Sequence, residues 1–175
     1  MLSSPRPGIR WGSHLLLVAI CLTPVSCWFY SFSGATIPSH LSTVAIPLAD
    51  DRTVSTVSGL DERLTQLFIE RFVGQTRLSL STSQQEADVV LRSTIQNYQN
   101  QPTSVGGDER ATRNRVTISV NVVYLDSKRN QEILSRTFSG FEEYDPLDPD
   151  LEEEAALAAL EKIADDVFTA ATSNW

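Results

Sequence analysis

The carboxylates Glu142, Glu143 and Asp145 are the side chains of this sequence best placed for acid and base chemistry. A hydrolase would use two of them as general acid and general base. Neighbouring residues of a strand point to opposite faces, however, so Glu142 and Glu143 make a poor pair. The sequence also lacks a G-x-S-x-G motif, a glycine-rich phosphate loop and a Ser/His/Asp arrangement with a usable histidine. We therefore expect no catalytic residues and no enzyme activity.

Residues that bind metals are equally scarce. The histidines are His14 and His40, and the cysteines are Cys21 and Cys27. His14 and Cys21 lie in an N-terminal segment that we expect to be removed, which would leave His40 and Cys27 isolated. Structural and catalytic zinc sites need clusters of such ligands. The sequence therefore predicts no metal site and no cofactor.

The N-terminal segment has the order of an export signal. Arg6 and Arg10 come first, no acidic residue precedes Asp50, an apolar run covers residues 15–22, and small residues end at Ser26. The apolar run is too short to cross a membrane, because a transmembrane helix needs roughly 20 apolar residues. We therefore expect cleavage after Ser26.

Cys27 follows that cleavage point, as in bacterial lipoproteins, where the cysteine becomes the acylated N-terminus. A lone cysteine in an exported chain has no disulfide partner, which favours this interpretation. Pro24 stands where the lipoprotein pattern usually has leucine, so a plain secretory signal with an incidental cysteine is the alternative. Trp28 rather than aspartate follows Cys27, which in many bacteria permits transfer to the outer membrane.

We divide the chain into a signal peptide (1–26), an acylated N-terminus with a linker (27–40) and one folded domain (41–175). Cleavage removes Arg6 and Arg10, which leaves 12 basic and 22 acidic residues and a net charge of −10. Such an acidic chain would repel nucleic acid, so we expect no nucleic-acid partner.

Hydrophobic periodicity predicts an α+β fold. Apolar residues alternate in four segments and recur at helical spacing in two. The predicted architecture is a two-layer α/β sandwich, in which a four-stranded mixed sheet carries both helices on one face, in the order β-α-β-β-β-α. The expected strands cover residues 42–48, 87–98, 115–126 and 132–144, and the expected helices run from Ser58 to Gly74 and onward from Asp148.

The last two strands are expected to form a hairpin with a defined register. Placing Arg115 opposite Glu142 puts Phe141 beside Val116 and leaves Ile133 on the core side. The other face of the sheet would then carry Thr, Ser, Asn, Gln and Arg side chains, which an antiparallel sheet can expose to water.

Several stretches resemble the LptE family of lipopolysaccharide-assembly lipoproteins. They are YSFSGATIP, TVAIPL, LDERLTQLFIERFVGQTRL, ADVVLRSTIQNY, RVTISVNVVYLD and the closing NW. The resemblance implies an α/β sandwich anchored to the periplasmic face of the outer membrane. It also implies that the chain forms a plug within the β-barrel protein LptD, and helps it to insert lipopolysaccharide in the outer leaflet.

Basic residues are the candidates for contact with the lipopolysaccharide phosphates. They are Arg110, Arg113 and Arg115 before or at the third long strand, and Lys128 and Arg129 in the turn after it. About a dozen strand residues, at roughly 3.3 Å each, separate the two groups by about 40 Å, so they cannot form one patch. Pairing of Arg115 with Glu142, and ordinary solvation of the two turn residues, are the structural alternatives.

One other class of function stays open. A lipoprotein of similar layout could act as an adaptor or activator of an envelope enzyme. It would then bind a periplasmic enzyme in place of a barrel. The partner that copurifies with the chain distinguishes the two.

Overall fold

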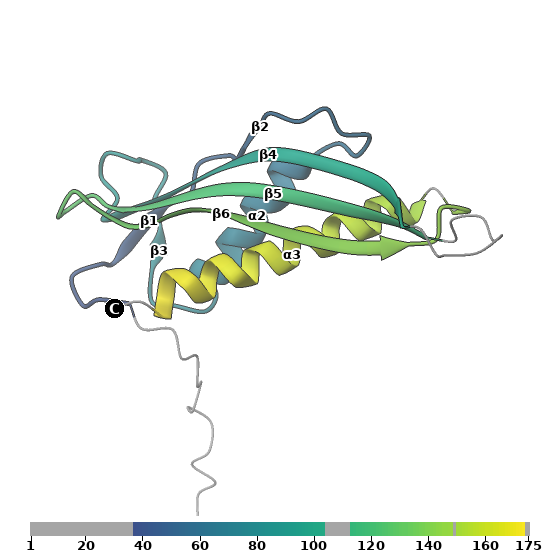
Figure 1. Cartoon of the computed structure of the whole chain (residues 1–175). Helices are drawn as coiled ribbons and strands as arrows, with labels where there is room; N and C mark the ends of the chain where they lie inside the picture. Colours follow the sequence, from purple (N-terminus) through teal and green to yellow (C-terminus); the bar gives the residue numbers. More distant parts are fainter. Residues whose placement is uncertain (1–36, 104–112, 149, 174–175) are drawn as a thin grey trace, which may run out of the picture. The chain divides into compact units, whose positions relative to one another are not determined.

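The computed structural model describes residues 37–103, 113–148 and 150–173 of the chain (Figure 1). The predicted signal peptide, Cys27 and Arg110 lie outside these ranges. No helix in the described part of the chain is long and apolar enough to span a bilayer.

The fold is α+β, as predicted, with a mixed sheet and two helices. The described sheet has six strands in the order β3-β1-β4-β5-β6, and β2 also pairs with β4. The two additional strands, β2 and β3, are only two residues long, too short for any periodic signal in the sequence. The elements are β1 (Thr43–Ala45), β2 (Asp50–Asp51), α2 (Leu60–Phe72), β3 (Ser79–Leu80), β4 (Val89–Thr103), β5 (Arg113–Asp126), β6 (Gln131–Tyr144) and α3 (Asp150–Ser173).

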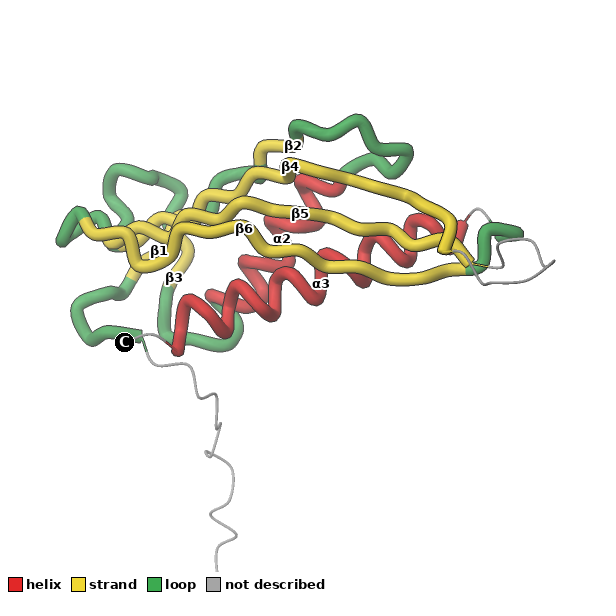
Figure 2. The backbone as a smooth tube through the Cα atoms, in the orientation of Figure 1, coloured by secondary structure: helices red, strands yellow, loops and turns green. Residues whose placement is uncertain are grey.

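Both described helices cover the same face of the sheet, and no helix of the described residues covers the other face (Figures 1 and 2). Helix α2 buries the apolar stripe that the sequence predicts, from Leu60 to Phe72. The start of the helix that the sequence predicts, at Ser58, is wrong. The helix begins after Gly59, whose φ of 73° is left-handed, and no side chain caps it. Gly59 suits this conformation because it has no Cβ.

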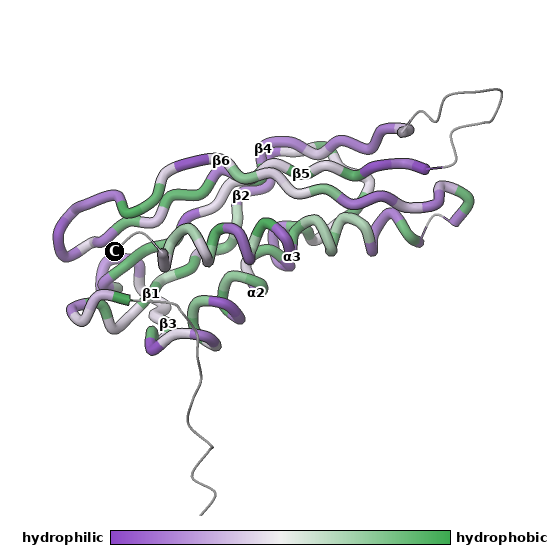
Figure 3. The backbone as a smooth tube through the Cα atoms, turned by 60° about the horizontal axis from the view of Figure 1, so that its bottom comes forward, coloured by the Kyte–Doolittle hydropathy of each residue, from purple (hydrophilic) through white to green (hydrophobic). Residues whose placement is uncertain are grey.

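Helix α3 packs on the sheet through small side chains. Its buried face is rich in alanine, and green, or hydrophobic, positions alternate with purple, hydrophilic ones along the helix in Figure 3. The contact is tightest where Ala159 faces Gly140 of β6, since a Cβ built on Gly140 would lie 2.3 Å from the Ala159 carbonyl oxygen. Strand β6 therefore needs a glycine at this crossing.

The predicted register of the β5–β6 hairpin is wrong by one residue. Arg115 pairs with Glu143 and not Glu142, and Phe141 pairs with Thr117 on the face without helices. Phe141 is 52% exposed. The core side of β6 is instead formed by a set that includes Gly140, which packs against α3. It consists of Leu134, Phe138, Gly140 and Tyr144.

A β-bulge in β4 changes which side chains face the helices. The pairing of β4 with β5 shifts between Ile95 and Asn97. Ile95 and Tyr98 therefore lie on the same face, although a regular strand would separate them. Tyr98 then reaches α3, where its hydroxyl donates a hydrogen bond to Glu152 over 2.7 Å.

Replacement of Gly140 by valine should destabilise the domain, because the new side chain would collide with the backbone of α3. Overpacking of this kind typically costs about 1–3 kcal/mol of unfolding free energy. Urea denaturation followed by circular dichroism measures it. Ser139→Val is the control, since Ser139 is exposed and points to the other face. An equal effect of the two substitutions would contradict the close packing of α3.

Candidate functional site

The sheet surface without helices presents a continuous set of neutral polar side chains, which we call the hydroxyl face. Its members interact with one another across the strands. The Ser119 and Ser139 hydroxyls lie 2.8 Å apart, and the Asn121 amide donates to the Thr137 hydroxyl over 3.4 Å. The hydroxyl face consists of Gln96, Thr117, Ser119, Asn121, Thr137 and Ser139.

The hydroxyl face suits contact with another polar wall. Its groups offer hydrogen-bond donors and acceptors, and none carries a formal charge. Covering neutral polar groups costs far less than covering an ion pair, as long as new hydrogen bonds replace those to water. The face can therefore lie against water or against a polar partner.

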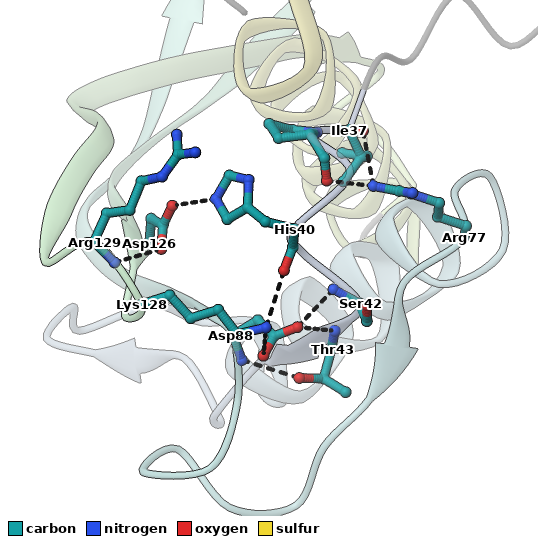
Figure 4. Close-up of polar contacts among 10 residues, drawn as sticks. Ile37, His40, Ser42, Thr43, Arg77, Asp88, Asp126, Lys128 and Arg129 are labelled. Carbon is teal, nitrogen blue, oxygen red and sulfur yellow. Dashed lines mark hydrogen bonds and ion pairs between the residues drawn. The ribbon is translucent and has the colours of Figure 1, made fainter.

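A second cluster holds the segment before β1 against the turn between β5 and β6 (Figure 4). We call it the tether clasp. It consists of His40, Arg77, Asp88, Asp126 and Lys128. The His40 Nε2 lies 2.7 Å from Asp126 Oδ2, and the Lys128 ammonium donates to the His40 carbonyl over 2.9 Å. Arg77 donates to the carbonyls of residues 37 and 38.

Asp88 connects the tether clasp to the start of β1. Its carboxylate accepts hydrogen bonds from the backbone N–H of Ser42, over 2.6 Å, and of Thr43, over 3.2 Å. Lys128 Nζ lies 2.9 Å from its other oxygen. The hydrogen bond from Lys128 and those from the two amides outweigh burial, and they hold the pKa of Asp88 below its usual range.

Asp126 has a similar electrostatic balance and is only 2% exposed. Burial opposes ionisation of the carboxyl, but the hydrogen bond from His40 and the backbone N–H of Arg129 outweigh it. The pKa of Asp126 is lowered. The hydrogen bonds and ion pairs of the tether clasp thus fix the segment before β1 to Arg77, Asp88 and the β5–β6 turn.

The basic residues predicted to contact phosphates lie at opposite ends of β5, as the strand length implies. Arg115 is bonded to Glu143 over 2.6 Å, and Lys128 belongs to the tether clasp. Within the described part of the chain, the guanidinium groups of Arg113 and Arg129 have no acidic partner. Arg110 lies outside the described residues.

Sequence reasoning did not find the tether clasp. His40 looks isolated in the sequence, because its partner Asp126 is far along the chain. The only usable signal was that Asp88 and Asp126 flank strongly apolar strands, where an unpaired carboxylate would be costly. Nothing in the sequence indicated the contacts of Arg77. Among the described residues, no group of three or more His, Cys, Asp or Glu side chains could hold a metal ion.

The tether clasp should make the domain sensitive to acid. Both carboxyl pKa values are lowered in the folded state, so their stabilisation is complete above the unfolded value of about 3.9 and is lost as the pH falls through the folded values. The double variant Asp88→Asn/Asp126→Asn should be less stable at pH 7 and should lose less stability on acidification. Urea titrations between neutral and acid pH measure this slope.

Glu132→Gln serves as the control, because Glu132 is exposed and has no side-chain partner among the described contacts. It should retain the acid dependence of the parent chain. A double variant that loses stability with falling pH as steeply as the parent would contradict the role assigned to the two aspartates.

Solved structures share this fold at low sequence identity. A Xanthomonas campestris protein aligns with TM-score 0.54 and 14% identity, over 76% of this chain and 85% of that chain. Rare lipoprotein B from Shewanella oneidensis aligns with TM-score 0.52 and 13% identity, over 75% and 95%. An uncharacterized lipoprotein B from Nitrosomonas europaea gives TM-score 0.51 and 13% identity, over 76% and 83%. No curated protein matches the chain significantly.

A family model identifies the chain more specifically than these structures do. The model described as LptE, lipopolysaccharide-assembly, matches residues 41–171. This range includes every described strand and nearly all of α3. The hydroxyl face and most of the tether clasp lie within it. The chain therefore belongs to the LptE family of lipopolysaccharide assembly.

Proposed function

We propose that this chain is an outer-membrane lipoprotein that occupies the lumen of an LptD-type β-barrel from the periplasmic side. In this position it supports the transport of lipopolysaccharide and its insertion in the outer leaflet. It acts by binding and without catalytic residues. Membership of the LptE family supports the role in lipopolysaccharide assembly.

The hydroxyl face is the observation that carries the proposal. The lumen of a membrane barrel is lined by polar residues. A plug needs a surface that can exchange hydrogen bonds with that lining without burying unpaired charge. The side chains of Ser119 and Asn121 on β5, and of Thr137 and Ser139 on β6, meet this requirement on two adjacent strands.

The anchor belongs to the same proposal. Acylation of Cys27 would attach the chain to the inner leaflet of the outer membrane, and the following Trp28 is compatible with that membrane. The tether clasp supports this arrangement, because it fixes residues 37–43 to Arg77, to Asp88 and to the β5–β6 turn. The linker would therefore leave the domain from one defined end.

Lipopolysaccharide contact is proposed for the basic residues named above. Arg113 and Arg129 are the better candidates, since neither guanidinium is committed to a carboxylate within the described residues. A free guanidinium can pair with a phosphate through two parallel hydrogen bonds. Arg115 and Lys128 would first have to leave Glu143 and Asp88.

A photoreactive amino acid at Ser119 or Thr137 should crosslink to a large β-barrel protein in intact cells. The same residue at Glu153 or Asp166, on exposed turns of α3, is the matched control and should crosslink much less. The tagged chain is purified from solubilised outer membrane, and the crosslinked partner is identified by mass spectrometry. Barrel adducts confined to the hydroxyl face are the expected result.

A barrel adduct at the helix positions alone would overturn the assignment of the hydroxyl face to the lumen. Capture of a periplasmic enzyme, with no barrel, would favour the adaptor function. Absence of any envelope partner would contradict both.

Replacing Cys27 by alanine should release a folded protein from the membrane. The variant is exported with a conventional cleavable signal, so that an uncleaved native signal cannot retain it. Each buried CH₂ of an acyl chain adds about 0.8 kcal/mol to membrane binding, and all of it is lost. Fractionation and incorporation of an alkyne palmitate measure the change. Cys21→Ala in the native chain is the control and should stay labelled.

A Cys27→Ala protein that remains in the membrane fraction and still incorporates the palmitate analogue would contradict the anchor. Loss of the circular dichroism signal would contradict the expectation that the core lies wholly downstream of Cys27.

A further inference from the structure

A groove of about 400 Å³ lies between the end of β6 and the first turns of α3. Its apolar surface comes from Tyr144, Leu151, Ala155 and Ala158. The groove lies on the N-terminal side of the tight contact between α3 and Gly140. The helix presents small alanine side chains here, and no further strand of the described residues lies beside β6, so this space stays unfilled.

Strand β6 is the outermost strand on this side of the described sheet. Lys162 of α3 covers its edge at one point, where the ammonium donates to the Phe141 carbonyl over 3.0 Å and also pairs with Glu142. A lysine on a strand edge hinders the addition of another strand. The groove beyond this point therefore suits an inserted side chain better than a paired strand.

The rim of the groove is acidic. Four carboxylates line it, from Glu142, Glu143, Asp145 and Glu154. Glu142 is paired with Lys162, and Glu143 is paired with Arg115. Asp145 and Glu154 line the groove and have no basic partner within the described part of the chain. One cation, Arg113 of β5, also lines the groove and only partly offsets their charge.

We propose that this groove binds an arginine side chain from an extended segment of a partner protein. The aliphatic stem of the arginine would lie on Leu151, Ala155 and Ala158, and its guanidinium would reach Asp145 and Glu154. Arginine fits better than lysine because its guanidinium is planar, weakly hydrated and pairs with carboxylates through two hydrogen bonds. The exposed Leu147 beside Asp145 offers the flanking segment an apolar contact. This inference does not depend on the barrel proposal.

The test uses the full-length chain in a non-ionic detergent and a short fluorescent peptide that contains arginine and leucine. Fluorescence anisotropy measures its affinity, and amide chemical shifts locate it. The citrulline version of the peptide has the same shape without the charge. Loss of one charge-assisted pair in Glu154→Gln should weaken binding about threefold to tenfold. Ala158→Arg, which supplies an arginine inside the groove, should abolish binding.

Asp166→Asn is the matched control, since it removes one charge from the exposed surface of the same helix outside the groove. Its affinity for the peptide should equal that of the parent chain. Circular dichroism establishes that each variant is folded.

Three results would overturn the proposal. The first is that the arginine and citrulline peptides bind equally well, or that neither peptide binds. The second is equal weakening by Glu154→Gln and Asp166→Asn, which would indicate a diffuse attraction to an acidic protein. The third is a shift map centred away from Tyr144 and Leu151, or self-association of the chain through the groove.

Discussion

The close packing of α3 on one face of the sheet determines most of the functional surface. Gly140 permits the contact, because any Cβ there would collide with the Ala159 carbonyl. Helix α2 lies on the same face and is joined to α3 at the rim by the pairs Arg63–Glu161 and Arg71–Asp165. With both helices on one side, the opposite face carries mostly polar residues, together with the half-exposed Phe141. The groove opens between the first turns of α3 and the end of β6.

A polar cluster lies at each end of the core between the sheet and the helices. At one end, the tether clasp surrounds Asp88 and Asp126. At the other, Glu152 of α3 meets Thr56, Tyr98 and Tyr144. Burial opposes ionisation of Glu152, but these hydroxyls donate to it and hold its pKa below the usual range. Carboxylates thus join chain segments that apolar packing alone would leave loose.

The sequence predicted the parts of the fold that rest on periodic burial and missed those that rest on single contacts. The alternation from Val116 to Tyr124 and the apolar stripe of α2 are both confirmed. The β6 register was missed because Phe138 and Phe141 point to opposite faces of the strand, and each suggests a different buried face. Only packing against α3 determines which of the two is buried. The tether clasp joins residues that are dozens of positions apart, a proximity that no local pattern contains.

A surface that binds its partner weakly can still be permanently occupied when the chain is anchored beside that partner. Each hydrogen bond exchanged across the hydroxyl face contributes only about 0.5–1.5 kcal/mol net. Acylation at Cys27 would leave residues 27–36 as the linker, which spans at most about 35 Å. The tether clasp prevents the linker from lengthening, because residues 37–43 stay bonded to the sheet. A short linker raises the effective concentration of a docking surface to the millimolar range. A neutral face therefore suffices for the plug proposed here. Charged residues at the margin of that face can then determine which partner is bound.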